Sequence, residues 1–558
     1  MEKKVMYIDG IEVEINGERN VLEVAKKIGI DIPAFCYDPE LSIYGACRMC
    51  IVEDDRGRLE ASCSMQPREG MVIKTNTPAI RKHRKMVLEL ILANHCRDCT
   101  TCLKSGNCRL QKFAVRYKIE DIRFPNNMGD VKADKSSDSI VRQPNKCILC
   151  GKCVRMCEEV QNVGAIHYAY RGAEMKIATA FDGDIANSPC VGCGQCAVVC
   201  PTGAIVVKDD ADKVLDAIGD KNTEVSVQIA PAVRVALGKE FGIQDGENLM
   251  GKLVTALKEI GFDKVYDTSL AADMTVIEET KEFLDRLEGK GKLPMFTSCC
   301  PAWIRFAENR YPDMLKNIST CKSPMQMFAP IIKREYKGDK KHVHVAIMPC
   351  TAKKFEAKRD EFKDKDGNSY VDYVLTTQEV VRMIKEQGIR LTATKESACD
   401  NPFGEITGAG VIFGVTGGVT EAVLRHVGGY SPTAYTAVRG LEGVKETSIK
   451  VDGSEVKIAV VSGLKNAADL IDRIKAGKVY YDLVEVMSCP GGCINGGGQP
   501  FTKRTLNARL SRSEGIYNAD KAEDKKSSET NQTVMELLKG MTDHEKHELL
   551  HVEYKPNK

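Results

Sequence analysis

The pattern of apolar and polar positions changes near residue 210. Residues 5–15 (VMYIDGIEVEI) alternate with a turn at Gly10, which predicts two short strands, and VLEVAKKIG predicts a short helix that ends at Gly29. Residues 81–95 predict an amphipathic helix with a basic start. After residue 210, the runs VSVQIA, VHVAIMP, AGVIFGV and IAVVSGL predict strands, with helices such as ENLMGKLVTALKEIG and TVIEETKEFLDRLEG between them. This alternation is typical of an α/β fold.

Length and charge narrow the class of protein. The chain has 558 residues, which predicts about three to five domains. Its formal net charge of +2 creates no global field that would favour nucleic acid or an anionic membrane. No run approaches the length of a membrane span, and the start MEKKVMYIDG has no signal-peptide pattern. We therefore expect a soluble cytoplasmic protein that binds neither nucleic acid nor membrane.

The cysteine content indicates metal binding. The chain has 23 cysteines, many of them at short, repeated spacings. In a reducing compartment such spacings indicate metal rather than disulfides. The first group is Cys36, Cys47, Cys50 and Cys63. Two strands, a helix and a cysteine loop over residues 1–80 predict a ferredoxin-like β-grasp domain with a 2Fe–2S cluster, although ten residues separate Cys36 from Cys47, unlike the plant-type spacing. Zinc is the alternative metal.

The second group, in residues 81–138, is His95, Cys99, Cys102 and Cys108. Three thiolates and one imidazole can hold either zinc or a 4Fe–4S cluster, and the spacing alone does not choose between them. Cys96 stands beside His95 and is an alternative fourth ligand.

The third group repeats one motif twice within residues 139–209. Cys147, Cys150, Cys153 and Cys157 have the spacing C-x2-C-x2-C-x3-C, and the same spacing recurs at Cys190, Cys193, Cys196 and Cys200, before Pro201. This is the bacterial two-cluster ferredoxin pattern, in which the fourth cysteine of each run binds the other cluster. One 4Fe–4S cluster is therefore predicted on Cys147, Cys150, Cys153 and Cys200, and the other on Cys157, Cys190, Cys193 and Cys196.

Three smaller groups lie in residues 210–500. They are TSCCPAW at 297–303, MPCTAKK at 348–354 and EVMSCPGGC at 485–493. Each follows an apolar strand-like run and leads into a turn with proline or glycine. Four thiolates from three distant loops can converge on one metal centre, and glycines let the backbone approach a bulky cofactor.

These three groups resemble the signature motifs of iron-only (FeFe) hydrogenases. The first two modules resemble those of complex I large subunits and of modular hydrogenases, so the resemblance covers nearly the whole chain and implies iron, with His95 rather than Cys96 as ligand. Residues 501–558 resemble the tail that wraps the hydrogenase domain. The resemblance implies an H-cluster, which is a 4Fe–4S cubane joined through one cysteine to a two-iron unit with carbon monoxide, cyanide and dithiolate. The implied ligands are Cys300, Cys350, Cys489 and Cys493, with Cys493 as the bridge.

The resemblance also implies roles around the cofactor. Lys353 is expected to hydrogen-bond one cyanide, and the backbone of Ala230, Pro231 and Ala232 to contact the other. Met348, Phe413 and Met487 are expected to line the cofactor, although Met and Phe in apolar runs are more often plain core.

A proton relay is implied as well. Glu279, Glu282 and Arg286 are spaced at i, i+3 and i+7, so they share one helix face. From the residues alone that face is a solvated one; the resemblance implies a relay from Arg286 at the mouth through Glu282, Ser319 and Glu279 to Cys299.

The expected function is reversible formation of H2 from protons and electrons, with electrons relayed through one 2Fe–2S and three accessory 4Fe–4S clusters. Expected partners are ferredoxin or NAD(P)H-oxidising subunits, together with maturation proteins that build the two-iron unit. A hydrogen sensor or an iron–sulfur assembly protein of the same fold is the alternative. The intact motifs and the presence of Cys299 favour the enzyme.

Some features receive no functional assignment. His547-Glu-Leu-Leu-His551 matches a zinc-protease motif, but it stands close to the end of the sequence without an evident cleft. Gly408, Gly410 and Gly414 give a loose dinucleotide motif with no strand before it. Cys321 and Cys399 have no motif partners and are expected to be structural.

Overall fold

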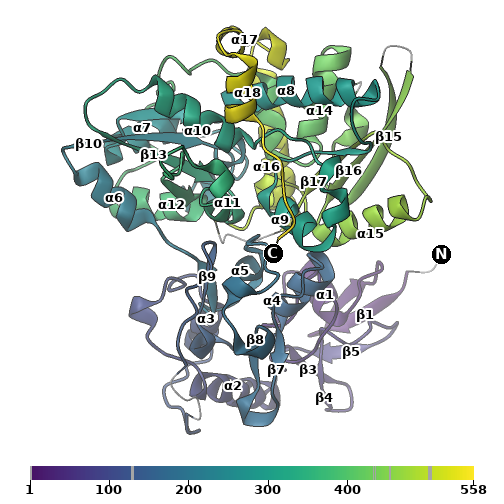
Figure 1. Cartoon of the computed structure of the whole chain (residues 1–558). Helices are drawn as coiled ribbons and strands as arrows, with labels where there is room; N and C mark the ends of the chain where they lie inside the picture. The colour runs from purple at the N-terminus through teal and green to yellow at the C-terminus, as the bar shows by residue number, and fades with distance from the viewer. Residues whose placement is uncertain are drawn as a thin grey trace. The chain divides into compact units, whose positions relative to one another are not determined.

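The computed structural model describes residues 3–126, 131–431, 433, 435–451, 454–500 and 505–557. The chain separates into two compact units, which are described one at a time (Figure 1). Unit 1 comprises Met1–Val160, Gly164–Ser188 and Cys196–Val206, and unit 2 comprises Gln161–Val163, Pro189–Gln195 and Val207–Lys558. Among the described residues, no helix combines the length and the apolar character that a membrane crossing requires.

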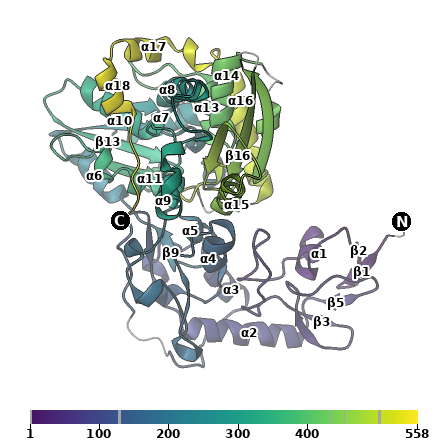
Figure 2. The ribbon, with the colours of Figure 1, turned by 45° about the vertical axis from the view of Figure 1, so that its right-hand side comes forward.

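Unit 1 begins with the predicted β-grasp domain (Figure 2). Its sheet has the order β2-β1-β5-β3-β4, with β1 antiparallel to β2 and parallel to β5. The strands are β1 (Val5–Ile8), β2 (Ile11–Glu14), β3 (Ile51–Asp54), β4 (Leu59–Ala61) and β5 (Val72–Lys74). Helix α1 (Val21–Lys27) packs its buried valines and leucine on this sheet, and the Asn20 side chain caps its first turn.

The rest of unit 1 consists of short elements around the cysteine groups. The predicted helix 81–95 is α2 (Pro78–Ala93); it begins three residues earlier, because Thr77 caps it and Pro78 suits the first helical position. The other elements up to residue 207 are α3 (Arg109–Arg116), β6 (Ile140–Arg142), α4 (Lys152–Arg155), β7 (His167–Ala169), β8 (Lys176–Ala178), α5 (Gln195–Val199) and β9 (Ile205–Val207).

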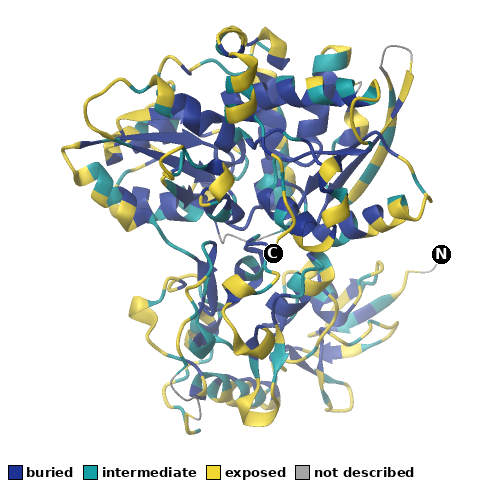
Figure 3. Cartoon of the chain, viewed as in Figure 1, coloured by how far each residue is buried: buried dark blue, intermediate teal, exposed yellow. Residues whose placement is uncertain are grey.

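Unit 2 contains two four-stranded sheets, of which the first is largely buried, whereas in the second the edge strand β15 is exposed to half-buried (Figure 3). The first has the order β11-β10-β13-β14 and is parallel throughout. The second has the order β12-β17-β16-β15, in which only β15 runs antiparallel to its neighbour. The strands are β10 (Thr223–Ile229), β11 (Lys264–Asp267), β12 (Met295–Phe296), β13 (Lys341–Met348), β14 (Tyr373–Thr376), β15 (Val444–Val451), β16 (Ser454–Ser462) and β17 (Leu483–Met487).

Helices surround these sheets, as the α/β pattern predicts. They are α6 (Ala211–Gly219), α7 (Met250–Ile260), α8 (Ser269–Leu287), α9 (Pro301–Arg310), α10 (Pro324–Glu335), α11 (Ala352–Glu356), α12 (Thr377–Glu386), α14 (Gly418–Gly428) and α15 (Leu464–Lys475), followed in the tail by α16 (Leu506–Ala522), α17 (Gln532–Lys539) and α18 (Asp543–Leu550).

One predicted strand is wrong. The run AGVIFGV, residues 409–415, forms helix α13 (Gly408–Val411) and a 3-10 turn over Ile412–Gly414. A short apolar run does not distinguish a buried strand from a buried helix by its periodicity. Thr407 caps the helix by accepting a hydrogen bond from the Gly410 amide, and a side chain at Gly410 would lie 2.2 Å from the Ser269 carbonyl oxygen. Close packing on α8 therefore decides the helical form.

The tail is tied to α8 through Asp273, which is fully buried. Its carboxylate accepts hydrogen bonds from the Thr407 amide, the Ser528 hydroxyl and the Asn531 side-chain amide, at 3.1, 2.8 and 2.9 Å. The polar segment at 528–531 thus obtains partners from the core of unit 2.

We expect Asp273→Ala to destabilise unit 2 by about 3 kcal/mol or more, because it leaves several buried donors without an acceptor. The melting temperature and the rate of limited proteolysis between α16 and α17 measure the effect. Asp366→Ala, at an exposed position, is the control. Equal stability of the two variants would contradict the role of Asp273.

Candidate active site

Four loops meet at the carboxyl ends of parallel strands in unit 2. The loop after β10 carries Ala230, Pro231 and Ala232, and those after β12, β13 and β17 carry the three cysteine groups. Because parallel strands present their carboxyl ends on one side, loops that are distant in sequence come together there.

These loops enclose a buried cavity of about 80 Å³. The predicted ligands Cys300, Cys350, Cys489 and Cys493 all line it. The other predicted residues that line it are Cys299, Lys353, Ala230, Pro231, Ala232, Met348, Phe413 and Met487. Four distant thiols thus share one pocket with the side chains predicted to surround a cofactor.

The electrostatics of the four thiols favour a metal. Burial and the charges of the neighbouring cysteines raise the pKa of Cys350 to about 12 and that of Cys489 well above its usual value. Four thiolates therefore cannot form together in this pocket unless a cationic centre compensates them. The Ser488 amide donates to the Cys300 Sγ at 3.4 Å, and the Gln195 amide group donates to the Cys489 Sγ at 3.1 Å. Such N–H···S contacts and an all-thiolate donor set fit an iron–sulfur centre.

Two glycines of the last loop allow the close approach of backbone that the sequence predicted. A side chain at Gly492, whose φ is +89°, would lie 2.5 Å from the Thr416 amide nitrogen. One at Gly496 would lie 2.1 Å from the Pro349 carbonyl oxygen. The loop that holds Cys489 and Cys493 therefore packs directly on the backbone beside the cavity.

Lys353 lies at the edge of the cavity on α11. Its ammonium donates to the Glu356 carboxylate at 2.7 Å and to the Cys299 carbonyl oxygen at 3.3 Å. The charge is thereby held against the turn that contains Cys299 and Cys300.

Glu279, Glu282, Ser319 and Arg286 do not line the cavity; they lie on α8 and on the loop before α10. The Ser319 hydroxyl donates to the Glu282 Oε2 at 3.1 Å, and the Arg286 Nε donates to the Glu282 Oε1 at 3.1 Å. The two carboxylate oxygens of Glu279 are buried and have no partner with full hydrogen-bond geometry among the described residues, but the Ser319 side chain and the Ser298 backbone lie close enough to favour the charged form. Burial and the Glu282 charge raise the pKa of Glu279 to about 8, so this carboxyl can both hold and release a proton near neutrality.

The position of Arg286 differs from the predicted one, which was the solvent-facing start of the proton relay. Its side chain is 8% exposed, whereas that of Glu282 is 15% exposed. The guanidinium also donates to the carbonyl oxygens of Lys292, Asn317 and Ile318, at 3.0, 3.1 and 2.8 Å. Arg286 therefore holds the Glu282 carboxylate in place through its own bonds to the backbone. Of the two side chains, that of Glu282 is more accessible to solvent.

The sequence did not single out Thr268 or Gln195. Thr268 lines the cavity and donates to the Gln228 side-chain oxygen at 3.0 Å; its position directly after β11 was the available signal. Gln195 stands inside the second ferredoxin motif, so its contact with Cys489 has no sequence signal. Cys193 also borders the cavity, which places a predicted ligand of an accessory cluster at the same pocket.

In unit 1, the four cysteines of the β-grasp domain lie together. The pKa of the Cys36 thiol is lowered by hydrogen bonds with Cys47 and Cys63, and that of Cys50 is lowered to about 7 by a hydrogen bond with Cys63. These contacts connect the four thiols in one group, which fits the predicted 2Fe–2S cluster.

The imidazole of His95, in the second cysteine group, has the burial and protonation state of a metal ligand. His95 is buried, and its Nδ1 makes no hydrogen bond to any described residue. Burial and the Lys146 charge lower its pKa to about 4, so the ring is neutral. The Cys96 thiol instead donates to the Asp98 carboxylate at 3.1 Å. This geometry favours His95 over Cys96 as the partner of Cys99, Cys102 and Cys108.

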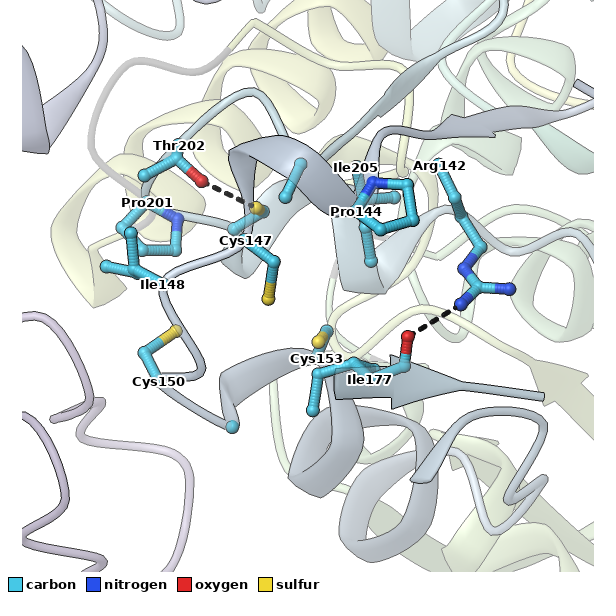
Figure 4. Close-up of a pocket in the computed structure, with 13 residues that line it drawn as sticks. Arg142, Pro144, Cys147, Ile148, Cys150, Cys153, Ile177, Pro201, Thr202 and Ile205 are labelled. Carbon is cyan, nitrogen blue, oxygen red and sulfur yellow. Dashed lines mark hydrogen bonds between the residues drawn. The ribbon is translucent and has the colours of Figure 1, made fainter. Parts of the chain in front are cut away.

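The third group forms a cavity of about 30 Å³ in unit 1 (Figure 4). Cys147, Cys150 and Cys153 line it together with Cys200 from the second run. The fourth cysteine thus lies with the other run, as the crossed pattern predicts. Cys157 and Cys196 belong to unit 1 whereas Cys190 and Cys193 belong to unit 2, so the grouping of these four stays a prediction.

A buried pocket with four thiols at the carboxyl ends of parallel strands, in a chain with several further cysteine groups, defines an iron–sulfur oxidoreductase. Residues 223–497 match the family model "Iron only hydrogenase large subunit, C-terminal domain", and residues 506–557 match "Iron hydrogenase small subunit". Residues 5–78, 84–123 and 146–204 match a 2Fe–2S cluster binding domain, the NADH-ubiquinone oxidoreductase-G iron–sulfur binding region and a 4Fe–4S dicluster domain.

Similar whole proteins agree with these matches. The chain is 40% identical to the NADP-reducing hydrogenase subunit HndD of Solidesulfovibrio fructosivorans, over 99% of each protein. It is 34% identical to iron hydrogenase 1 of Clostridium pasteurianum, over 99% of this chain and 100% of that protein. A solved structure of apo [FeFe]-hydrogenase HydA1 from Chlamydomonas reinhardtii matches 62% of this chain and 98% of its own with a TM-score of 0.55 and 37% identity. The chain belongs to the iron-only (FeFe) hydrogenase family, and it is a hydrogenase with accessory iron–sulfur domains.

Proposed function

We propose that the 80 Å³ cavity holds the H-cluster on Cys300, Cys350, Cys489 and Cys493, and that protons, electrons and H2 are interconverted there. The observation that carries the proposal is the convergence of four thiols from three distant loops on one buried pocket. When bound, the H-cluster supplies the redox-active iron that exchanges electrons with hydrogen.

The protein's own residues position the cofactor and exclude water from it. The apolar side chains of Met348, Phe413 and Met487 line the pocket and keep it dry. The Lys353 ammonium, held by Glu356, supplies a cationic donor for one anionic diatomic ligand. In residues 230–232, Pro231 has no N–H and the Ala230 amide donates to the Ile347 carbonyl oxygen at 2.9 Å, so the Ala232 amide is the donor for the second ligand.

Protons reach the pocket through Glu282, Ser319, Glu279 and Cys299, with Arg286 holding Glu282 in place. The contacts between Arg286, Glu282 and Ser319 have hydrogen-bond lengths. Burial raises the pKa of the Cys299 thiol well above its usual value, and Glu279 is close enough for its charge to raise this pKa further. The relay thus consists of groups that each accept and release a proton.

The accessory cysteine groups would hold the electron carriers. Cys36, Cys47, Cys50 and Cys63 would hold a 2Fe–2S cluster and the remaining groups three 4Fe–4S clusters, and these would supply one-electron carriers. Because Cys193 borders the H-cluster pocket, a cluster that it binds would be the last carrier before the active site.

We expect about 20 iron atoms per chain, which is the sum of one 2Fe–2S, three 4Fe–4S and the six irons of the H-cluster. Anaerobic co-expression with maturation enzymes, followed by iron and zinc analysis, checks the number. One zinc and about four fewer irons would show that the His95 group holds zinc. In the same preparation, H2 evolution with a reduced dye tests the function itself, and no evolution from a fully loaded protein would refute it.

The accessory domains support a proposal for the class of electron partner. The relative HndD is named a subunit of an NADP-reducing hydrogenase, and residues 84–123 match a region of an NADH-oxidising complex. We infer that this chain works in the cytoplasm and exchanges electrons with an NAD(P)H-oxidising subunit rather than with ferredoxin alone. Reduction of the accessory clusters by NADPH only in the presence of such a subunit would support this, and rapid reduction by ferredoxin alone would contradict it.

A further inference from the structure

One residue of the proposed proton relay, Glu282, also belongs to a group of side chains that could bind a metal. Neither the cysteine motifs nor the proposed function explains this group. Ligand atoms of Glu282, Cys321 and His551 all lie within 4.8 Å of one another. Cys321 is fully buried, whereas Glu282 and His551 are partly buried, with side chains 15% and 17% exposed. The three residues come from α8, from the loop before α10 and from the C-terminal end of α18.

The backbone holds this group in place. Cys321 and His551 are opposite each other in an antiparallel bridge. The Lys322 amide donates to the Leu550 carbonyl oxygen at 2.7 Å, and the Val552 amide donates to the Thr320 carbonyl oxygen at 2.7 Å. The distance between the two residues is therefore set by an isolated antiparallel bridge between their backbones.

The orientation of the side chains suits a metal. The Glu282 Oε1 accepts hydrogen bonds from Arg286. Its Oε2 accepts from the Thr320 hydroxyl at 3.0 Å, the Thr320 amide at 2.9 Å and the Ser319 hydroxyl at 3.1 Å, so a metal at Oε2 would replace these donors. The Thr320 hydroxyl also lies 2.9 Å from the His551 Nδ1, so it bridges two of the ligand atoms. The other ring nitrogen, Nε2, faces the Glu278 carboxylate at 3.4 Å. A carboxylate behind a histidine is the arrangement that orients a metal-binding imidazole.

The acidic groups around Cys321 also favour the binding of a cation. Burial and the charges of Glu279, Glu282 and Glu278 raise the pKa of the Cys321 thiol well above its usual value. Such a set of acidic groups around a thiol attracts a dication, which would permit the thiolate to form.

We propose that Glu282, Cys321 and His551 bind a divalent transition-metal ion of the zinc class, and that this ion blocks proton movement through Glu282. One sulfur, one nitrogen and one oxygen form a donor set that zinc accepts, and the Thr320 hydroxyl or water completes four-coordination. The metal occupies the lone pairs of the Glu282 Oε2 that otherwise accept the hydrogen bond from Ser319. His551 is the second histidine of the HELLH sequence, whereas His547 is exposed and remains outside the group.

The binding half of this proposal is independent of the proposed function, and the inhibitory half rests on it. The test uses the anaerobic, iron-loaded holoenzyme with added zinc, followed by desalting, metal analysis and X-ray absorption at the zinc edge. We expect one additional zinc per chain with one sulfur at about 2.3 Å and nitrogen or oxygen ligands at about 2.0–2.2 Å. Cys321→Ser and His551→Gln should lose this zinc, and Glu278→Gln should weaken its binding about 10- to 100-fold.

His547→Gln and Cys399→Ser are the matched controls and should bind zinc as the wild type does. Iron content is measured throughout and should not change. Equal zinc binding by all variants, a spectrum without sulfur, or loss of iron on zinc addition would each overturn the site. Neither the metal analysis nor the spectrum requires turnover, so the site remains testable even if the chain forms no hydrogen.

Inhibition is tested separately by H2 evolution at increasing zinc concentration. We expect at least a tenfold loss of rate in the wild type at saturating zinc and recovery with a chelator, whereas the rate of His551→Gln, relative to its own zinc-free rate, should not fall. Equal inhibition of the two proteins would overturn the inhibitory half.

Discussion

Replacing Cys299 by serine is expected to leave the H-cluster assembled and to lower hydrogen turnover about 100-fold or more, the range of a lost proton-transfer group. Cys299 borders the cavity beside Cys300, a proposed ligand. Burial raises the pKa of the Cys299 thiol well above its usual value, but a serine hydroxyl is a weaker acid still and cannot replace the thiol. Rates of H2 evolution and H2 oxidation with a dye measure the loss, and infrared bands of carbon monoxide and cyanide show that the cofactor is intact.

Glu279→Gln should have a similar effect, because the amide keeps the shape of the side chain and cannot ionise. Cys399→Ser and Glu288→Gln are controls: Cys399 is a thiol of the same unit that does not line the cavity, and Glu288 is exposed just beyond the end of α8. If Cys299→Ser or Glu279→Gln has an intact cofactor and near wild-type rates in both directions, protons reach the pocket by another route.

Replacing Cys350 by alanine is expected to abolish turnover and to lower the iron content from about 20 to about 14 atoms, because the H-cluster loses one of its thiolate ligands. Cys350 lies directly after β13, and its sulfur faces the same cavity as the three other cysteines. The accessory clusters bind elsewhere and should remain. Iron analysis and the electron paramagnetic resonance signals of the reduced accessory clusters separate the two populations of iron.

Cys399→Ser again serves as the control and should retain full iron. A Cys350→Ala protein with unchanged iron and measurable turnover would show that Cys350 is not a ligand, and the assignment of the pocket would then be wrong. A protein that loses the accessory iron as well would indicate general unfolding; Cys350→Ser, which keeps the size of the side chain, then decides the question by the same two measurements.

The pattern of the sequence predicted much of the local structure correctly. The hairpin around Gly10, the helix that became α2 and the strands that became β10, β13 and β16 all follow from apolar periodicity. The run at 409–415 did not, since its seven mostly apolar residues suit a strand or a helix equally well. Contacts of Gly410 with α8 decide between the two, and such contacts are not encoded in local periodicity.

By itself, the sequence determined the chemistry of this protein: the kinds of metal ligand, their spacing within each run and the family to which the chain belongs. The spacing within a motif is a local property, so it can be interpreted without knowledge of the fold. Only the tertiary structure decided which distant residues share a site. It brought Cys300, Cys350, Cys489 and Cys493 to one cavity, placed Gln195 on Cys489 and set Cys321 beside His551 and Glu282. The physical reason is that these contacts depend on the order of parallel strands and on the path of the tail, which arise from packing across hundreds of residues.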